Sequence, residues 1–140
     1  MTIERGLRIT KNIALKSNYK NSQNRFIRIG AAVFNKKGYL IATNVNQKKT
    51  HHLMAYYNKE MPFNRIPYLH AEIAALLKAR WAIGEKGLKG CTVFVARKLN
   101  KEGWGLAKPC PACRKAMIDM GVNKIVYTTE TGFSVEYLDK

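Results

Sequence analysis

The sequence predicts a three-layer α/β domain, in which a mixed five-stranded β-sheet is flanked by helices. Strand-like apolar segments alternate with segments of helical periodicity along the whole chain. The last two strand-like segments are separated only by residues 129–132, and a turn this short joins antiparallel but not parallel strands. The length of 140 residues suits one domain, so we expect residues 1–140 to form a single unit.

The first half of the chain is expected to form a helix and a β-hairpin. Residues 3–16 have the pattern of a basic amphipathic helix. Residues 26–34 read as a buried strand, and residues 39–43 read as its hairpin partner after a polar turn. Residues 44–69 have no clear period, which predicts a long irregular loop.

The second half is expected to contain two helices and three strands. The clearest helix covers residues 70–83, carries Trp81 on its apolar face and ends at Gly84. Cys91 precedes the next strand and reads as a core residue. The other expected elements are a strand at 92–96, a loop at 98–108, a helix from the Pro109–Cys113 segment to about Met120 with Gly121 as its C-cap, and strands at 124–128 and 133–138.

The composition describes a basic protein of a reducing compartment. Lysine and arginine total 25 against 9 acids, for a net charge of +16, which concentrates anions such as phosphates or nucleic acid near the surface. A merely solvated basic surface is the alternative. The 3 cysteines are few and odd in number, which argues against a disulfide framework. The sequence shows neither a signal peptide nor a membrane span, so we expect a cytoplasmic protein without a membrane partner.

The chemistry-bearing residues lie at the starts of the two central helices. Cys110 and Cys113 are three apart in a first helical turn, where the helix N-terminus favours thiolates. Taken alone, this pair fits a redox site and a zinc site about equally. His70 and Glu72 open the other helix, and one imidazole with two thiolates leaves a fourth zinc position for water, as catalytic zinc requires. Glu72 is the candidate proton carrier.

Together, His-x-Glu and Pro-Cys-x-x-Cys resemble the signature of the cytidine deaminase superfamily. The resemblance extends from Phe26 to Tyr127 and implies the cytidine deaminase-like fold. It implies Zn²⁺ as cofactor, and it implies the site roles that follow. His70, Cys110 and Cys113 are the metal ligands, Glu72 is the catalytic proton shuttle, the backbone of Ala71 holds the pyrimidine carbonyl, and the backbone of Lys108 accepts the exocyclic amine.

Three features bear on the branch of this superfamily. The segment after the second strand resembles that of nucleoside deaminases, whose sugar-binding asparagine matches Asn44; a shifted alignment matches Asn46 to the asparagine of adenosine-type and deoxycytidylate enzymes. Arg114 follows the second cysteine, as in cytidine deaminases, and could offset thiolate charge as readily as lie on the surface. The short final turn, with its antiparallel last strand, resembles the nucleoside branch and also some bacterial DNA deaminase toxins.

These observations favour hydrolytic deamination of a cytosine moiety in a nucleoside or nucleotide such as deoxycytidine or dCMP. Alternatives are a base editor of cytosine or adenine in single-stranded DNA or RNA, and a basic nucleic-acid-binding protein with structural zinc. Trp104 could stack on a base or close the pocket. Because this fold often forms homo-oligomers, we expect a homo-oligomer here. The basic and aromatic residues of the 44–69 loop fit either a grip on single strands or a solvated loop with core-anchoring tyrosines; they are Lys48, Lys49, His51, His52, Tyr56, Tyr57, Lys59, Arg65 and Tyr68.

Overall fold

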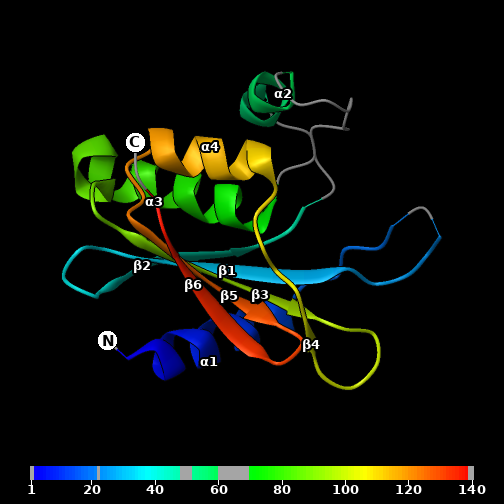
Figure 1. Cartoon of the computed structure of the whole chain (residues 1–140). Coiled ribbons are helices and arrows are strands. Elements are labelled where there is room, and N and C mark those ends of the chain that lie inside the picture. Colours follow the sequence, from blue (N-terminus) through cyan, green and yellow to red (C-terminus); the bar gives the residue numbers. More distant parts are fainter. Residues whose placement is uncertain (1, 22, 48–51, 60–69, 139–140) are drawn as a thin grey trace.

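The computed structural model describes residues 2–21, 23–47, 52–59 and 70–138. Its layers are visible in Figure 1, with α3 and α4 side by side on one face of the sheet and α1 on the other. The helices are α1 (Ile3–Ala14), α2 (His52–Asn58), α3 (Ala71–Leu88) and α4 (Pro111–Asp119). The strands are β1 (Arg28–Phe34), β2 (Leu40–Val45), β3 (Thr92–Lys98), β4 (Trp104–Gly105), β5 (Lys124–Thr129) and β6 (Gly132–Tyr137).

The sheet has the order β2-β1-β3-β5-β6, with β4 paired to the end of β3. The β3–β5 pair is parallel and the other pairs are antiparallel. The predicted five strands are therefore confirmed, including the antiparallel last strand, in which Thr129 pairs with Gly132. The difference is β4, a sixth strand of only two residues inside the segment expected to be a loop.

One side of the sheet packs against α1. Leu7 of the helix joins Phe34 and Phe94 in a buried cluster, and these two rings meet edge to face at 5.2 Å. Glycine allows α1 to approach closely, because a Cβ added at Gly30 would lie 2.4 Å from the backbone nitrogen of Ala14. Alternate side chains of β1 and β3 therefore face α1, and the intervening ones face α3.

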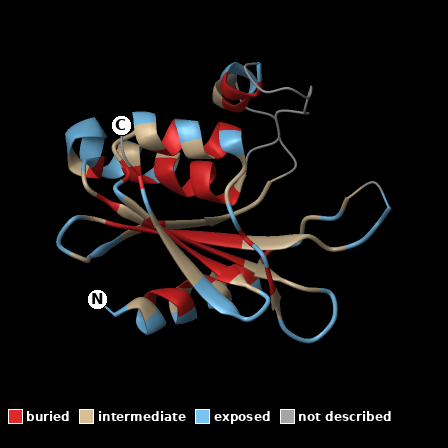
Figure 2. Cartoon of the chain, in the orientation of Figure 1, coloured by how far each residue is buried: buried red, intermediate tan, exposed pale blue. Residues whose placement is uncertain are grey.

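The other side of the sheet carries the larger core, formed with α3 and α4 (Figure 2). Ile73, Leu76 and Met117 are fully buried there, and burying each such side chain contributes roughly 1.5–3 kcal/mol. Cys91 is also fully buried, which confirms its expected place in the core. This packing fixes the starts of α3 and α4 relative to each other.

The prediction for Trp81 is wrong, because its side chain is 91% exposed. The buried face of α3 includes Leu76 and Ala79, and a residue two positions after Ala79 points about 200° away around a helix of 3.6 residues per turn. The helix breaks where expected, at Gly84 with φ of 77°, but a further helical stretch follows as far as Leu88.

The segment expected to be irregular contains α2, which lies against α4. Met54 and Tyr57, three apart in this helix, are buried, and the Tyr57 hydroxyl donates to Asp119 Oδ2 at 2.6 Å. A helix of two turns is too short to show a clear hydrophobic period, and its burial depends on α4 from a distant part of the chain. Among the described residues, no helix combines the length and apolar character needed to span a membrane.

Candidate active site

The candidate site forms where the N-termini of α3 and α4 meet. His70 is the N-cap of α3 and makes no side-chain capping bond, so its imidazole is free to point toward α4. Cys110 is the N-cap of α4, and its sulfur accepts a hydrogen bond from the Cys113 amide at 3.4 Å. Pro111 follows at the first helical position, where a missing N–H costs nothing. Both helix starts thus present side chains to one point.

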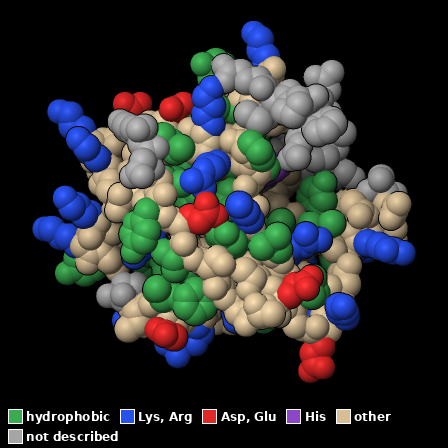
Figure 3. All heavy atoms as spheres, viewed as in Figure 1, with side chains coloured by type: hydrophobic (Ala, Val, Ile, Leu, Met, Phe, Trp, Pro, Cys, Tyr) green, Lys and Arg blue, Asp and Glu red, His purple; other side chains and the backbone are tan. Residues whose placement is uncertain are grey.

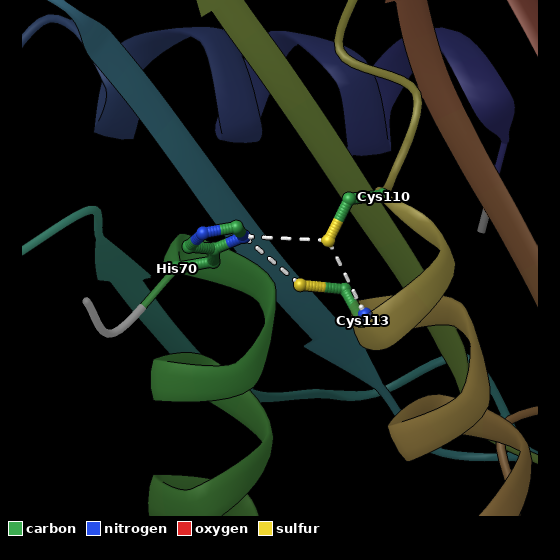
Figure 4. A group of neighbouring side chains, drawn as sticks. All are labelled: His70, Cys110 and Cys113. Atoms are coloured by element: carbon green, nitrogen blue, oxygen red, sulfur yellow. Dashed lines mark hydrogen bonds between the residues drawn. The ribbon is translucent and has the colours of Figure 1, made fainter. Parts of the chain in front are cut away.

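Figure 4 shows His70, Cys110 and Cys113 pointing toward one another. The Nδ1 atom of His70 lies 3.0 Å from Cys113 Sγ and 3.9 Å from Cys110 Sγ. Glu72 Oε1 lies 3.5 Å from the same nitrogen, and Glu72 is only 4% exposed. A buried carboxylate beside three soft donors is a costly arrangement unless the site uses it.

The three donor groups perturb one another's protonation. A hydrogen bond with Cys113, with help from His70, lowers the pKa of Cys110 to about 4. Burial lowers the pKa of His70, but hydrogen bonds to Cys110 and Glu72 outweigh this effect and raise it to about 10. The hydrogen bond to Cys110 and burial raise the pKa of Cys113 well above its usual range. Without metal, the cluster therefore stores protons at neutral pH.

This donor set fits zinc. The His70, Cys110 and Cys113 ligand atoms all lie within 4.8 Å of one another, as the corners of a small coordination polyhedron do. One nitrogen and two sulfurs suit Zn²⁺ rather than Mg²⁺ or Ca²⁺, which prefer oxygen. Glu72 lies beside the cluster without completing it, so a fourth position stays available.

The segment before Cys110 is pinned to the sheet by Thr128. Its hydroxyl, fully buried, donates to the carbonyl of Gly105 at 2.7 Å and accepts from the Arg97 amide at 3.1 Å. Its carbonyl accepts from the Ala107 amide at 2.9 Å. These bonds set the path of the chain into Cys110 independently of any metal.

A cavity of about 310 Å³ opens directly above the cluster. Its floor includes His70, Glu72 and Cys110, and its walls combine apolar and polar groups. The apolar walls include Ile29, Val95 and Ala107. A volume of this order accepts a small organic ligand, and a few polar groups among apolar walls would fix its orientation.

Comparison with known proteins agrees with this geometry. The family described as the cytidine and deoxycytidylate deaminase zinc-binding region matches residues 3–129. The chain belongs to this family. It is a deaminase, and zinc is its cofactor. No curated protein sequence matches the chain.

Three solved structures show the same fold as this deaminase. Cytidine deaminase from Burkholderia pseudomallei has a TM-score of 0.64 at 21% identity, over 98% of this chain and 93% of the other. Cytidine deaminase from Mycobacterium leprae has a TM-score of 0.59 at 20% identity, over 96% and 93%. The dCMP deaminase from cyanophage S-TIM5, in complex with dCMP and dUMP, has a TM-score of 0.57 at 23% identity, over 92% and 84%.

Three of the four expected substrate-binding residues of the deaminase line the cavity, and the fourth, Asn44, does not. Ala71 and Lys108 line it, as does Asn46. The Asn46 amide is already engaged, since it donates to the Ile27 carbonyl at 2.7 Å and accepts from Ser17 Oγ at 2.7 Å. Asn44 is not among the lining residues, and its side chain accepts from the Val45 and Gln47 nitrogens.

Arg114 of the deaminase pairs with a carboxylate instead of the cysteine sulfurs. Its Nη1 is bonded to Glu136 Oε1 on β6, and the Tyr127 hydroxyl donates to Glu136 Oε2 at 2.7 Å. The Lys108 ammonium lies 3.9 Å from the same oxygen. The Tyr127 hydrogen bond, followed by the Arg114 pair, lowers the pKa of Glu136. The final strand thus supplies a counterion beside the zinc helix, a role that sequence spacing did not indicate.

Other expected site residues lie away from the cavity or outside the described residues. Trp104 is not among the residues that line the cavity; its ring lies near the ammonium groups of Lys11 and Lys98. Of the basic and aromatic loop residues, Tyr57 is the core anchor described above and Tyr56 is 59% exposed, with Lys59 also exposed. Those that lie outside the described residues are Lys48, Lys49, His51, Arg65 and Tyr68, together with the side chain of His52.

Sequence reasoning missed several cavity residues, notably Tyr19, Ile29 and Arg97. For Ile29 and Arg97 the available signal was alternation, because every second residue of β1 and β3 faces the same side as the metal ligands. A larger open hollow, of about 1040 Å³, lies near the far ends of α3 and α4 and contains none of the three donor residues.

Proposed function

We propose that the chain catalyses hydrolytic deamination of a cytosine moiety in a nucleoside or nucleotide such as deoxycytidine or dCMP. The products are the corresponding uracil compound and ammonia. The observation that carries this proposal is the cluster of His70, Cys110 and Cys113 beside the buried Glu72, adjoining a small, partly apolar cavity that His70, Glu72 and Cys110 line.

In this proposal His70, Cys110 and Cys113 hold the zinc ion. When bound, zinc lowers the pKa of water to about 7 and so supplies a nucleophile at neutral pH. The Glu72 carboxylate takes the proton of the attacking water. It gives this first proton to the ring nitrogen, then takes the second proton from the hydroxyl formed on the ring carbon and gives it to the amine, so that the C–N bond breaks, the carbonyl of uracil forms and ammonia departs. Glu72 lines the cavity and is buried, which limits the access of bulk water to this carboxylate.

The cavity walls supply the orientation of the base. Ile29, Val95 and Ala107 offer apolar surface against a flat ring. The Ala71 amide is at the first position of α3, where helical N–H groups have no internal partner, so it is available to the pyrimidine carbonyl. The Lys108 carbonyl is the proposed acceptor for the exocyclic amine, on a chain segment that Thr128 holds in place.

The cations of the cavity favour a monophosphate over a free nucleoside. Arg97 and Lys108 both line the cavity, and no ion pair of Arg97 occurs among the described residues. A guanidinium matches the geometry of a phosphate. The cyanophage structure of similar fold holds dCMP and dUMP, which is consistent with a nucleotide ligand.

The test compares deamination of deoxycytidine and dCMP by the zinc-loaded protein and two variants. We expect the unmodified protein to prefer dCMP, and Arg97→Gln to lower kcat/KM for dCMP roughly tenfold or more while leaving deoxycytidine nearly unchanged, because one charge-assisted phosphate contact is worth about 1.5–3 kcal/mol. Arg80→Gln, which removes an equal charge at the distant hollow, is the control. No deamination of either compound by zinc-loaded protein would refute the proposed reaction, and equal loss on both would remove Arg97 from phosphate recognition.

A purely structural zinc site is the less favoured reading. A structural site is closed by four protein ligands, whereas this cluster offers three and adjoins a cavity. Glu72 would also have no role in a closed site. The homo-oligomeric state and the cytoplasmic location stay predictions from the sequence.

A further inference from the structure

We propose that a second surface, next to the cavity, binds single-stranded nucleic acid. This surface, the sheet-end patch, comprises two aromatic rings and four cations: Lys11, Lys20, Phe26, Arg28, Lys98 and Trp104. The inference rests on the proposed function only for the identity of the base that enters the cavity.

The first half of the sheet-end patch is built on Phe26. The Lys20 ammonium lies 4.8 Å from the centre of this ring, and the Arg28 guanidinium carbon lies 4.4 Å from it. An isolated antiparallel β-bridge between Lys20 and Phe26 joins the two chain segments that carry these residues. Cation–π contacts restrict these long side chains, so their charges are held in place before any ligand arrives.

The second half is built on Trp104. The ammonium groups of Lys11 and Lys98 lie 5.2 Å and 5.8 Å from its ring centre. Lys98 pairs with Trp104 across β3 and β4 and with Arg28 across β1 and β3. Because directly paired residues project to the same side of a sheet, the two halves form one continuous surface on the α1 side.

The positive charge of the sheet-end patch is not neutralised within the described part of the chain. None of its four cations forms an ion pair there. Lys98 also donates to the carbonyls of Leu99, Lys101 and Gly103, at 3.0–3.2 Å, which orders the loop and keeps the charge. Figure 3 shows more basic than acidic side chains on the visible face, in keeping with the net charge of +16.

The sheet-end patch and the cavity share the same end of the sheet. Along each of three segments, residues that line the cavity alternate with residues of the patch. The cavity-lining residues are Tyr19, Asn21, Ile27, Ile29 and Arg97. The patch residues next to them in the sequence are Lys20, Phe26, Arg28 and Lys98. The two sites therefore lie on opposite faces, separated by one layer of sheet. A chain of nucleotides with one base in the cavity can pass around the sheet end onto the patch.

This geometry selects a polymer in single-stranded form. A mononucleotide in the cavity has no further phosphates to place on the patch. A duplex would keep its bases paired and would have to release one before it could enter the cavity. Fixed cations can contact the backbone of a single strand without requiring its bases to be paired.

The experiment measures binding of fluorescein-labelled single-stranded DNA and RNA oligonucleotides by fluorescence anisotropy, at about 50 and 200 mM salt. Unlabelled single strands, duplex DNA and heparin serve as competitors. The patch variant is Lys11→Ala/Lys20→Ala/Arg28→Ala, in which Lys98 is kept because it orders its loop. The matched control is Lys36→Ala/Lys86→Ala/Lys89→Ala, which removes the same charge around the distant hollow.

We expect the patch variant to bind single strands roughly ten- to a hundredfold more weakly at 0.1 M salt, with a salt slope smaller by about 2, because each lost contact on a single strand lowers the slope by about 0.7. The matched control should bind almost as the unmodified protein does. Deamination of dCMP should be unchanged in both variants, since none of the six residues lines the cavity. If the triple patch variant does not fold, Lys20→Ala alone should weaken binding severalfold, because Lys20 is exposed and, within the described part of the chain, is held by its bridge and its ring contact.

Three results would overturn the inference. They are absence of single-strand binding, equal losses in the patch variant and the matched control, and competition by heparin or duplex as strong as by single strands. Each of these would leave dCMP deamination intact and therefore the proposed function standing. Conversely, single-strand binding without any deamination would preserve the sheet-end patch and refute the proposed function.

Discussion

Replacing Tyr57 by phenylalanine tests whether α2 is docked on the zinc-bearing helix as the structure has it. The Tyr57 hydroxyl donates to Asp119 Oδ2 at 2.6 Å, and the residue is 6% exposed. Burial, with the hydrogen bond to Asp119, raises the pKa of this phenol. The substitution removes the hydrogen bond and keeps the ring. Tyr56→Phe is a control in the same helix, because Tyr56 is 59% exposed.

The expected loss follows from the chemistry of this bond. A hydrogen bond to a charged group contributes roughly 1.5–3 kcal/mol. With an unfolding entropy of about 2.1 cal/mol/K per residue over 140 residues, this corresponds to a fall in Tm of roughly 5–10 °C. Tyr56→Phe should change Tm by about 2 °C or less, because surface substitutions stay within about 0.5 kcal/mol.

The assay is thermal unfolding followed by circular dichroism, in excess zinc so that all three proteins carry the same metal. Chemical denaturation checks that the transition is two-state and supplies the free energies of unfolding. Equal stability of Tyr57→Phe and Tyr56→Phe would refute the docking of α2 through Asp119.

Two further predictions concern the charges around the site. Zinc binding at pH 7 should release about two protons. The raised pKa values of His70 and Cys113 keep both groups protonated in the metal-free cluster, whereas Cys110 is already a thiolate. Calorimetry in buffers of different ionisation enthalpy counts the released protons, and a release near zero would contradict the coupled cluster. Glu136→Gln should cost about 1 kcal/mol of stability at pH 7, since the ion pair is partly exposed and screened. The folded-state pKa of Glu136 is depressed, so its contribution to stability is complete above the unfolded pKa near 4.5 and is lost as the pH falls through the folded pKa. Denaturation at acid pH should therefore show a smaller stability difference between Glu136→Gln and the unmodified protein. A stability difference that stays constant with pH would mean that charge is not the cause.

Local patterns predicted the parts of this protein that depend on neighbouring residues. Cys110 and Cys113 share a helical turn, and the 129–132 turn permits only an antiparallel final pair, so both features could be inferred from spacing. The break at Gly84 and the buried Cys91 follow from the same short-range signals.

Features that depend on long-range contacts could not be predicted in this way. Tyr57 is buried only because Asp119 and α4 lie opposite it. Trp81 reads as a core residue until the orientation of α3 is known. From the sequence alone, Arg114 could offset the charge of the nearby cysteine sulfurs or lie on the surface. Only the folded chain shows that the Glu136 carboxylate of β6 lies within reach of its guanidinium. The chemistry of the site could therefore be predicted from residues close in sequence, whereas the surroundings of the site depend on contacts between residues far apart in sequence.

The central claim, that Glu72 moves the protons at a zinc site held by three other residues, is tested most directly by Glu72→Gln. The measurement is the rate of dCMP and deoxycytidine deamination, followed by ultraviolet absorbance, together with the zinc content of the same sample. Because Glu72 contributes no ligand atom, we expect about one zinc per chain and a rate lower by roughly 10²–10⁴. Glu85→Gln, which changes an exposed acid of the same helix, should keep both zinc and activity. A Glu72→Gln protein that retains zinc and most of its turnover would contradict the account.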